Sequence, residues 1–460
     1  MKQALKVPAL ALAGVLVAVA LLGSQALPRR PGPALTDAAL FDDSILHRIE
    51  LQVSERDWAT LRENFMQNTY YPATFIWRGE TARNVGIRSR GTGTRSGTKP
   101  HLLVDFDRYV SGQRFLGLGA LVLDNNLQDQ SAMKEALTMA VHNRLGIAAP
   151  REASAVLYIN GTFLGVYTMV ERVDEFAISR MFDPKPAEPE LVFPGRPPAR
   201  SGANSGTRAP APPAGRAVPA TPLPAPQVEP LPTGYLFDYE WVDHFYWTYP
   251  GPDLDFYAER FEADTREDEP LETVYRPVER MFHEINEAPD DRFVERAGAW
   301  LDLRQFVRVA AIQAYMAEWD GLLGAFGMNN FYLYRPAAGP PHVIIPWDED
   351  NTFFAVDYPV DSGINDGVVM RRAMMVPELR ALFFETLEEV AALTEARGND
   401  GLGWLEREVL RRTSMLRTPM AEDRVKPHTQ EEFESVAASN LDFARRRAGI
   451  VRAQVREMER

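Results

Sequence analysis

The chain has 460 residues, with 50 Lys and Arg against 64 Asp and Glu, so its formal net charge is −14. Its length allows two or three domains, and its hydrophobic fraction of 45% excludes a chain that is disordered throughout. The acidic balance argues against a nucleic-acid-binding protein, and the absence of cysteine excludes disulfides, thiolate metal sites and a cysteine nucleophile.

The N-terminal segment predicts export. Lys2 and Lys6 precede an uncharged, apolar stretch over residues 7–23, and small residues follow at Ser24 and Ala26. This order is typical of a signal peptide, although the stretch also reaches the lower limit of a membrane span. Residues 1–26 are therefore predicted to be either a cleaved signal peptide or a single membrane anchor. Residues 27–44 are predicted to be a tether, and the protein is expected to be secreted or membrane-anchored.

Residues 45–183 are predicted to form a β-rich N-terminal lobe. Asn160-Gly161 is typical of a type I′ turn between the two strands of a hairpin. Met133, Leu137 and Val141 recur at four-residue spacing, which predicts a helix. The expected strands cover 49–53, 85–91, 101–107, 120–126 and the hairpin 154–171, and the expected helix covers 131–145.

The rest of the chain divides into an insertion and a helical lobe. Residues 184–233 hold 15 of the 35 prolines and are predicted to be a disordered Pro/Ala-rich insertion. Residues 234–460 are predicted to form a mainly helical C-terminal lobe, and the whole chain is assigned to the α+β class. Its expected helices cover 271–286, 303–318, 376–394, 403–413 and 429–457, with two strands at 329–336 and 342–354.

Two acidic elements in the C-terminal lobe point to phosphoryl transfer. Asp348 and Asp350 follow an apolar strand, where carboxylates can hold a hard cation such as Mg²⁺; a solvated turn is the alternative. Asp320 ends a predicted helix, and Asn330 follows ten residues later. An acid that orients a hydroxyl, together with an amide and a second acid that hold Mg²⁺, is the set that phosphoryl transfer requires. Taken alone, Asp320 is equally well explained as a helix-end residue.

The N-terminal lobe offers candidate phosphate ligands. The loop 91–99 is rich in glycine, hydroxyls and cations and ends at Lys99, but it is not a Walker A loop and also resembles an ordinary hairpin loop. Arg88 and Arg90 precede it on one face of a strand, where they require either a ligand phosphate or a structural carboxylate.

Two glutamates complete the candidate nucleotide site. Glu135 is predicted to pair with Lys99, as a helix glutamate pairs with a strand lysine in protein kinases, with an exposed helix-surface pair as the alternative. Glu171 ends the predicted hairpin and is expected at the hinge between the lobes, close to an adenine-binding surface.

Taken in order, these elements resemble the CotH family of spore-coat-type atypical protein kinases. The resemblance extends from about residue 45 to beyond residue 390. The motifs that carry it are Val85-Gly-Ile-Arg-Ser-Arg-Gly91, Lys99, Phe115-Leu-Gly-Leu118, Leu123-Asp-Asn-Asn126, Asp129-Gln-Ser-Ala-Met-Lys-Glu135, Tyr158-Ile-Asn-Gly161, Gly165-Val-Tyr167, Glu171, Asn330-Phe-Tyr-Leu-Tyr334 and Ile345-Pro-Trp-Asp-Glu-Asp350.

The resemblance implies a kinase-like, two-lobed fold that binds ATP and Mg²⁺ and phosphorylates Ser or Thr in protein substrates. Position by position, it implies Asp320 as the catalytic acid and Lys99 and Arg90 as phosphate contacts. The implied metal ligands are Asp348, Asp350 and Asn330.

The sequence departs from the family at two positions near these residues. Trp319 precedes Asp320 where relatives often carry Asn, and Lys134 stands beside Glu135 where they carry Arg. Neither departure removes an acid that the chemistry needs. A catalytically inactive envelope or surface assembly module on the same scaffold is the alternative function, and transfer to a glycan is a third. The acceptor, the source of ATP outside the cell and the oligomeric state are left open by the sequence.

Overall fold

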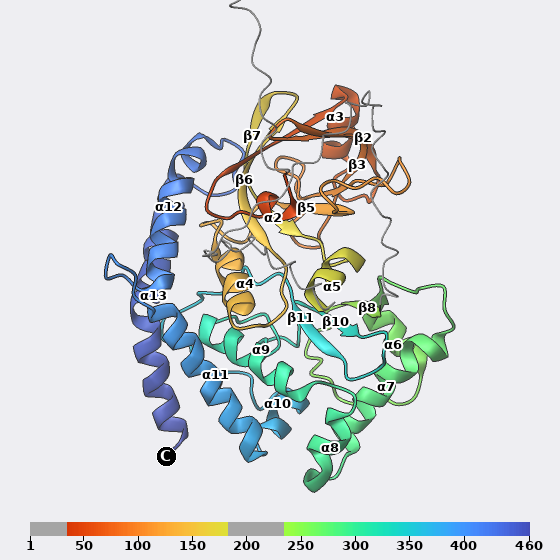
Figure 1. Cartoon of the computed structure of the whole chain (residues 1–460), viewed down its shortest axis with the longest axis vertical. Helices are drawn as coiled ribbons and strands as arrows, with labels where there is room; N and C mark the ends of the chain where they lie inside the picture. The colour runs from red at the N-terminus through yellow and green to blue at the C-terminus, as the bar shows by residue number, and fades with distance from the viewer. Residues whose placement is uncertain (1–34, 183–233) are drawn as a thin grey trace, which may run out of the picture.

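A computed structural model describes residues 35–182 and 234–460, in which a β-rich N-terminal region adjoins a largely helical C-terminal region (Figure 1). The α+β class expected from the sequence is confirmed. The predicted signal peptide or anchor and the Pro-rich insertion lie outside the described residues. Within the two described ranges, no helix combines the length and apolar character that crossing a membrane requires.

The N-terminal region is a closed barrel of seven strands in the order β1-β2-β3-β4-β5-β7-β6. The barrel closes through parallel pairing of β1 with β6, whereas its other neighbours are antiparallel. The sequence predicted a β-rich lobe but not this closure, because alternation identifies the faces of a strand and not its neighbours. The strands are β1 (His47–Val53), β2 (Tyr71–Trp77), β3 (Glu80–Ser89), β4 (Leu102–Asp105), β5 (Ala120–Asp124), β6 (Glu152–Ile159) and β7 (Thr162–Glu171).

Alternating side chains fill the barrel interior. Ile49 and Leu51 are completely buried, while Arg48 and Gln52 are exposed and Glu50 is half-buried. The predicted turn between β6 and β7 is present, with positive φ at Asn160 (50°) and Gly161 (80°) as a type I′ turn requires. The segment predicted as a tether contributes to this core, since its short helix α2 (Asp37–Leu40) buries Leu40 completely.

A second sheet of four strands, in the order β11-β10-β8-β9, belongs to the C-terminal region. Only the β10–β11 hairpin was expected from the sequence. Antiparallel pairing aligns Phe331 with Pro346, which brings the residues before β10 next to the acidic residues after β11. The strands are β8 (Tyr235–Tyr239), β9 (Phe261–Ala263), β10 (Phe331–Arg335) and β11 (Val343–Pro346).

Helices surround this second sheet and extend beside the barrel (Figure 1). The six predicted helices are present, but α12 continues past residue 413 because Leu416 and Met420 extend its buried face. Helix α12 contacts strand β7, and α13 packs against α11 and α12, so the end of the chain joins both regions. The helices are α3 (Glu55–Glu63), α4 (Lys134–Arg144), α5 (Glu175–Phe182), α6 (Leu254–Arg260), α7 (Leu271–Glu287), η1 (Asp290–Arg292), α8 (Phe293–Gly298), α9 (Leu303–Met316), α10 (Val368–Ala373), α11 (Pro377–Glu395), α12 (Trp404–Glu422) and α13 (Gln430–Met458).

Candidate functional site

A polar cavity of about 430 Å³ lies between the barrel and the second sheet. Its barrel side comes from the β3–β4 loop, β5, β7 and α4, and its other side from the end of β8, the α9–β10 loop and the end of β11. Residues from the two regions that line it are Arg90, Gly91, Thr92, Gly93, Thr94, His101, Val122, Asp124, Gln128, Glu135 and Val170, and Asp238, Tyr239, Glu240, Trp241, Asp320, Asn329, Asn330, Phe331, Trp347, Asp348 and Asn351.

Asp320 reaches the cavity because of the way α9 ends. Ala317 adopts a left-handed conformation with φ of 55° and turns the chain out of the helix. The buried Gln313 accepts a hydrogen bond from Leu322 N at 2.8 Å, and Glu318 accepts one from Asp320 N at 2.7 Å. These contacts hold the α9–β10 loop in place from both sides of Asp320.

Two asparagines fix the carboxylate of Asp320. Asn329 Nδ2 donates to Asp320 Oδ2 at 3.2 Å, and Asn330 Nδ2 donates to Asp320 O at 3.1 Å and to Oδ2 at 3.4 Å. The amide oxygen of Asn330 takes no part in these bonds. Burial raises the pKa of Asp320, and the nearby charge of Asp348 raises it further against the lowering effect of the two amides. Asp320 is thus an oriented carboxylate with enhanced basicity, as a proton acceptor needs.

Asp348 approaches the same cavity from the end of β11. Trp347 N donates to Asn330 O at 3.1 Å, which continues the β10–β11 pairing to the acidic segment. Asp348 and Asn330 both have positive φ, 53° and 61°, a conformation uncommon outside glycine and often found at functional sites. Burial, followed by the charge of Asp124, raises the pKa of Asp348 to about 6, against the lowering effect of Arg90.

Further carboxylates crowd the same place, and the charges of Arg90 and Lys99 offset their repulsion only in part. Burial is the first cause that raises the pKa values of Glu135, Asp350 and Asp124, and each of them is also raised by neighbouring acids. Asp350 lies outside the main cavity and lines a small adjoining one with Asp124 and Glu135. Its Oδ1 atom is buried and has no hydrogen-bond partner among the described residues. A bound cation would relieve this mutual repulsion.

The donor atoms suit a hard divalent ion. Carboxylate and amide oxygens of Asp348, Asp350 and Asn330 are ligands that Mg²⁺ prefers. Within residues 35–182 and 234–460, no group of three or more His, Asp or Glu side chains is arranged so that it could hold a metal ion by itself. Mg²⁺ at phosphate sites is usually held by one or two carboxylates with the phosphates and water, so these residues fit that mode of binding.

Arg90 brings a guanidinium group to the opposite wall. It lies over the Trp347 ring at 5.5 Å, and its positive charge lowers the pKa of Asp348. The chain then enters the glycine-rich loop, whose first four residues line the cavity. A guanidinium beside exposed backbone of this loop is suited to a phosphate group.

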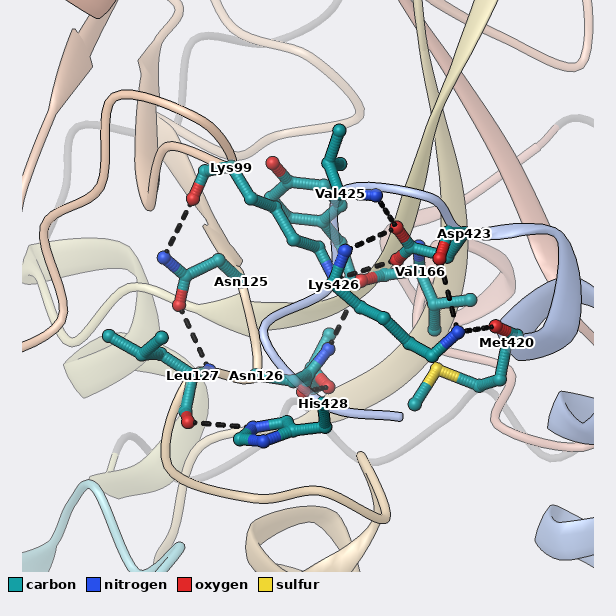
Figure 2. A network of polar contacts seen from close by, with 12 residues as sticks. Lys99, Asn125, Asn126, Leu127, Val166, Met420, Asp423, Val425, Lys426 and His428 are labelled. Atoms are coloured by element: carbon teal, nitrogen blue, oxygen red, sulfur yellow. Dashed lines mark hydrogen bonds and ion pairs between the residues drawn. The ribbon is translucent and has the colours of Figure 1, made fainter. Parts of the chain in front are cut away.

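Lys99 does not line this cavity. Its Nζ donates to Asp423 Oδ2 at 2.9 Å, and the two side chains are 4% and 0% exposed (Figure 2). The predicted Lys99–Glu135 pair is therefore wrong. Glu135 instead faces the cavity acids, and Lys99 is buried against the α12–α13 connection.

Arg88 and Glu171 also point to other partners. Arg88 donates to Asn68 Oδ1 at 3.3 Å and to Ser89 O at 3.0 Å, so its partners are neutral oxygens and not the carboxylate expected as the structural alternative. Glu171 does end β7, but its carboxylate pairs with Arg151 and Arg180, each at 2.6 Å. Neither side chain lines the cavity, although Val170 beside Glu171 does.

The cavity also contains acids to which the sequence reading gave no role. Asp124 is the last residue of β5, and Asp348 comes shortly after the end of β11. The position of an acid at a strand end, which identified Asp348, could therefore have identified Asp124 as well. Asp238 lies in β8, and burial followed by the charge of Asp264 raises its pKa to about 7. Asp423, which lies outside the cavity, could not be predicted as the partner of Lys99, because the two residues are 324 positions apart in sequence.

The fold and the cavity define a mixed α+β protein with an acidic site between a barrel and a second sheet. The family model described as "CotH kinase protein" matches residues 87–201 and 250–451, well over half of the chain. The chain belongs to the CotH kinase family, as its motifs predicted, and the family indicates a protein-kinase-like function. No match to the chain was found among curated proteins.

Proposed function

We propose that the chain is an ATP-dependent protein kinase that transfers the γ-phosphoryl group of ATP to Ser or Thr of protein substrates. The observation that carries this proposal is the convergence of Asp320, Asn330 and Asp348 with Arg90 on one cavity. These residues come from both regions of the chain, and family membership supports the same chemistry. A turn exposed to solvent would not require this convergence.

In this proposal the molecule has a kinase-like, two-lobed organisation. The barrel is the first lobe, and the second sheet with its helices is the other. ATP occupies the cavity between them, with its phosphates beside Arg90 and the glycine-rich loop. The charge balance supports this placement, because Arg90 is surrounded by acids whose repulsion of ATP a metal ion must offset.

The chain's residues have separate tasks in this proposal. Asp320, oriented by Asn329 and Asn330, positions the acceptor hydroxyl and accepts its proton. Asp348, Asp350 and Asn330 hold Mg²⁺, which supplies neutralisation of the phosphate charge when bound. Catalysis is then mainly positioning and electrostatic stabilisation.

Exposed aromatic side chains beside Asp320 support a protein acceptor. Phe326 and Phe354 are 50% and 61% exposed, and the Trp319 ring lies 6.2 Å from each of them. Aromatic side chains are enriched at protein interfaces, because they bury a large area at low conformational cost. We place the acceptor chain over these rings.

Phosphate incorporation tests this proposal. The purified full-length chain is expected to transfer labelled phosphate from ATP to protein when Mg²⁺ is present, and Asp320→Ala is expected to abolish transfer. Label that appears on carbohydrate instead would indicate a glycan acceptor. Nucleotide binding without transfer to either acceptor, or no nucleotide binding, would favour the inactive assembly module.

We also propose that the protein acts outside the cytoplasm, on the basis of the charged and apolar pattern in residues 1–26. Cell fractionation with mass spectrometry of the N-terminus distinguishes a peptide cleaved after Ala26 from an intact anchor. Recovery of the protein only from the cytoplasm would contradict export. If the protein is exported, ATP has to reach it during or after export.

A further inference from the structure

The connection between α12 and α13, residues 423–429, contacts the two loops that line the barrel side of the candidate site. We propose that it is a clamp that positions the nucleotide site, and that Lys99 and Asp423 are positioning residues and not phosphate ligands. This inference rests on the proposed nucleotide-binding function. It assigns a task to the C-terminal helix pair, which forms neither wall of the cavity.

The carboxylate of Asp423 is the centre of the clamp. Its Oδ2 accepts hydrogen bonds from Lys99 Nζ at 2.9 Å and from Val166 N at 3.0 Å. Its Oδ1 accepts from Val425 N at 3.0 Å and from Lys426 N at 2.8 Å (Figure 2). A buried acid with four donors, one of them the paired cation Lys99, joins the connection to the β3–β4 loop and to β7.

The barrel is shaped to receive this carboxylate. A Cβ atom at Gly165 would collide with Asp423 Oδ2, so glycine leaves room for the acid to approach β7. The Tyr167 ring lies 5.2 Å from Lys99 Nζ, and its hydroxyl donates to Pro100 O at 3.1 Å. The Gly165-Val-Tyr167 motif therefore builds a socket for the ion pair and has no contact with the cavity.

Two hydrogen bonds transmit this anchoring to the glycine-rich loop. The buried Asn125 donates through Nδ2 to Thr94 O at 2.8 Å and to Lys99 O at 2.9 Å. Thr94 itself lines the cavity. The ion pair therefore fixes the end of the loop at Lys99. Asn125 connects this end by hydrogen bonds to Thr94, in the part of the loop that lines the cavity.

The second loop is held in the same way. His428 Nε2 donates to Leu127 O at 2.9 Å, next to Gln128 in the cavity wall (Figure 2). Asn125 Oδ1 accepts from Leu127 N at 3.1 Å within this second loop, while its Nδ2 donates to Thr94 O and Lys99 O of the first, so Asn125 connects the two loops. The α12–α13 connection thus contacts both loops from outside the cavity.

The test compares Lys99→Met, Asp423→Asn and the double variant in the full-length chain. Affinity for ATP, KM and kcat are measured with amide hydrogen exchange of residues 91–99 and 125–128. Each single variant is expected to raise KM for ATP on the order of tenfold while kcat at saturating ATP changes little. The double variant is expected to be no worse than the more impaired single variant, because both remove one interaction.

Arg417→Met is the matched control. Arg417 and Glu434 form an ion pair at 2.7 Å on the same two helices, but their side chains are 56% and 40% exposed and lie outside the cavity lining. This variant is expected to leave KM for ATP and loop exchange unchanged.

Two results would overturn the clamp. A rise in KM with Lys99→Met but not with Asp423→Asn would make Lys99 a phosphate ligand. Lowered stability with unchanged KM and unchanged loop exchange would leave the pair a merely structural role. If the ion-pair variants do not fold, His428→Ala replaces them, and it must raise both KM and the exchange of residues 125–128.

The exchange measurement also separates this inference from the proposed function. If the wild-type chain does not bind ATP, the kinase proposal is contradicted, but amide hydrogen exchange of the loops can still be compared between wild type and variants. Faster exchange of residues 91–99 in Asp423→Asn would then support the anchoring contact. Unchanged exchange would overturn it whether or not nucleotide binds.

Discussion

The backbone conformation of Asp348 limits which residues can replace it without strain. Asn and Asp tolerate a positive φ better than most residues, and Asp348 has φ of 53°. Asp348 lines the cavity, and burial followed by the charge of Asp124 raises its pKa. Asparagine can therefore keep the fold and remove only the charge.

Asp348→Asn is expected to reduce Mg²⁺-dependent phosphate transfer by at least about 100-fold, because metal neutralisation contributes several kcal/mol to such reactions. The thermal midpoint should change by only a few degrees. Asp361→Asn, at an exposed position after the same segment, is the control. Wild-type transfer rates in Asp348→Asn would remove this residue from the mechanism.

His342 provides a test of pH dependence away from the site. It is fully buried, its Nδ1 donates to Trp300 O at 2.7 Å, and burial lowers its pKa to about 4. The unfolded chain binds this proton more tightly, so the stabilising contribution is complete above about pH 6.5 and is lost as the pH falls through 4.

His342→Gln keeps a donor for Trp300 O but removes the titration. The difference in unfolding free energy between wild type and variant is expected to change by on the order of 3 kcal/mol between about pH 7 and pH 4. Urea unfolding at several pH values measures this difference. Parallel pH profiles for the two proteins would show that His342 does not contribute.

At the residue scale, the sequence predicted which acids and amides line the cavity better than it predicted which side chains bind each other. Asp320, Asn330 and Asp348 could be singled out because acids and amides at element ends are accessible to a ligand. The partner of Lys99 could not be predicted, because Asp423 meets it only after the last two helices have packed. The position of Arg88 was mispredicted for a related reason. Strand alternation predicts the face of the sheet on which a side chain lies, but not which residues a long side chain then contacts.

At the element scale, a buried polar network joins helices α4 and α9 to the end of β11. His142 Nε2 donates to Glu349 Oε2 at 3.0 Å, and Gln313 Nε2 donates to Glu349 Oε1 at 2.6 Å. All three side chains are at most 1% exposed. Because Gln313 also holds Leu322 N, this network couples the loop of Asp320 to the segment of Asp348.

Glu349→Ala is expected to lower the free energy of unfolding by about 3 to 5 kcal/mol, since it leaves buried donors without an acceptor. Glu349→Gln should cost less, because it keeps one acceptor oxygen. Denaturant unfolding measures both. If Glu349→Ala costs no more than an average surface substitution, the network does not hold these elements together.

The elements themselves were predictable where their signal is local. The predicted helices 271–286, 303–318, 376–394 and 429–457 correspond to α7, α9, α11 and α13, and the predicted Asn160-Gly161 turn is present. Strand β2 was missed, and its Pro72 is a residue that argues against a strand. The pairing of β8 with β10 joins segments far apart in the chain, so no local pattern predicts it.

At the scale of the whole molecule, the site depends on two regions that meet. The barrel contributes Arg90 and the glycine-rich loop, and the second sheet contributes Asp320 and Asp348. The last two helices then contact the barrel and the helical region together (Figure 1). A single site between the two regions requires that substitutions on either side of the cavity affect the same ligand.

Titration of the full-length chain with ATP, with and without Mg²⁺, tests that requirement most directly. The account predicts Mg²⁺-dependent binding that both Arg90→Met on the barrel and Asp348→Asn on the second sheet weaken on the order of tenfold or more. Binding of equal strength without Mg²⁺, or binding that neither substitution changes, would contradict a nucleotide site between the two regions.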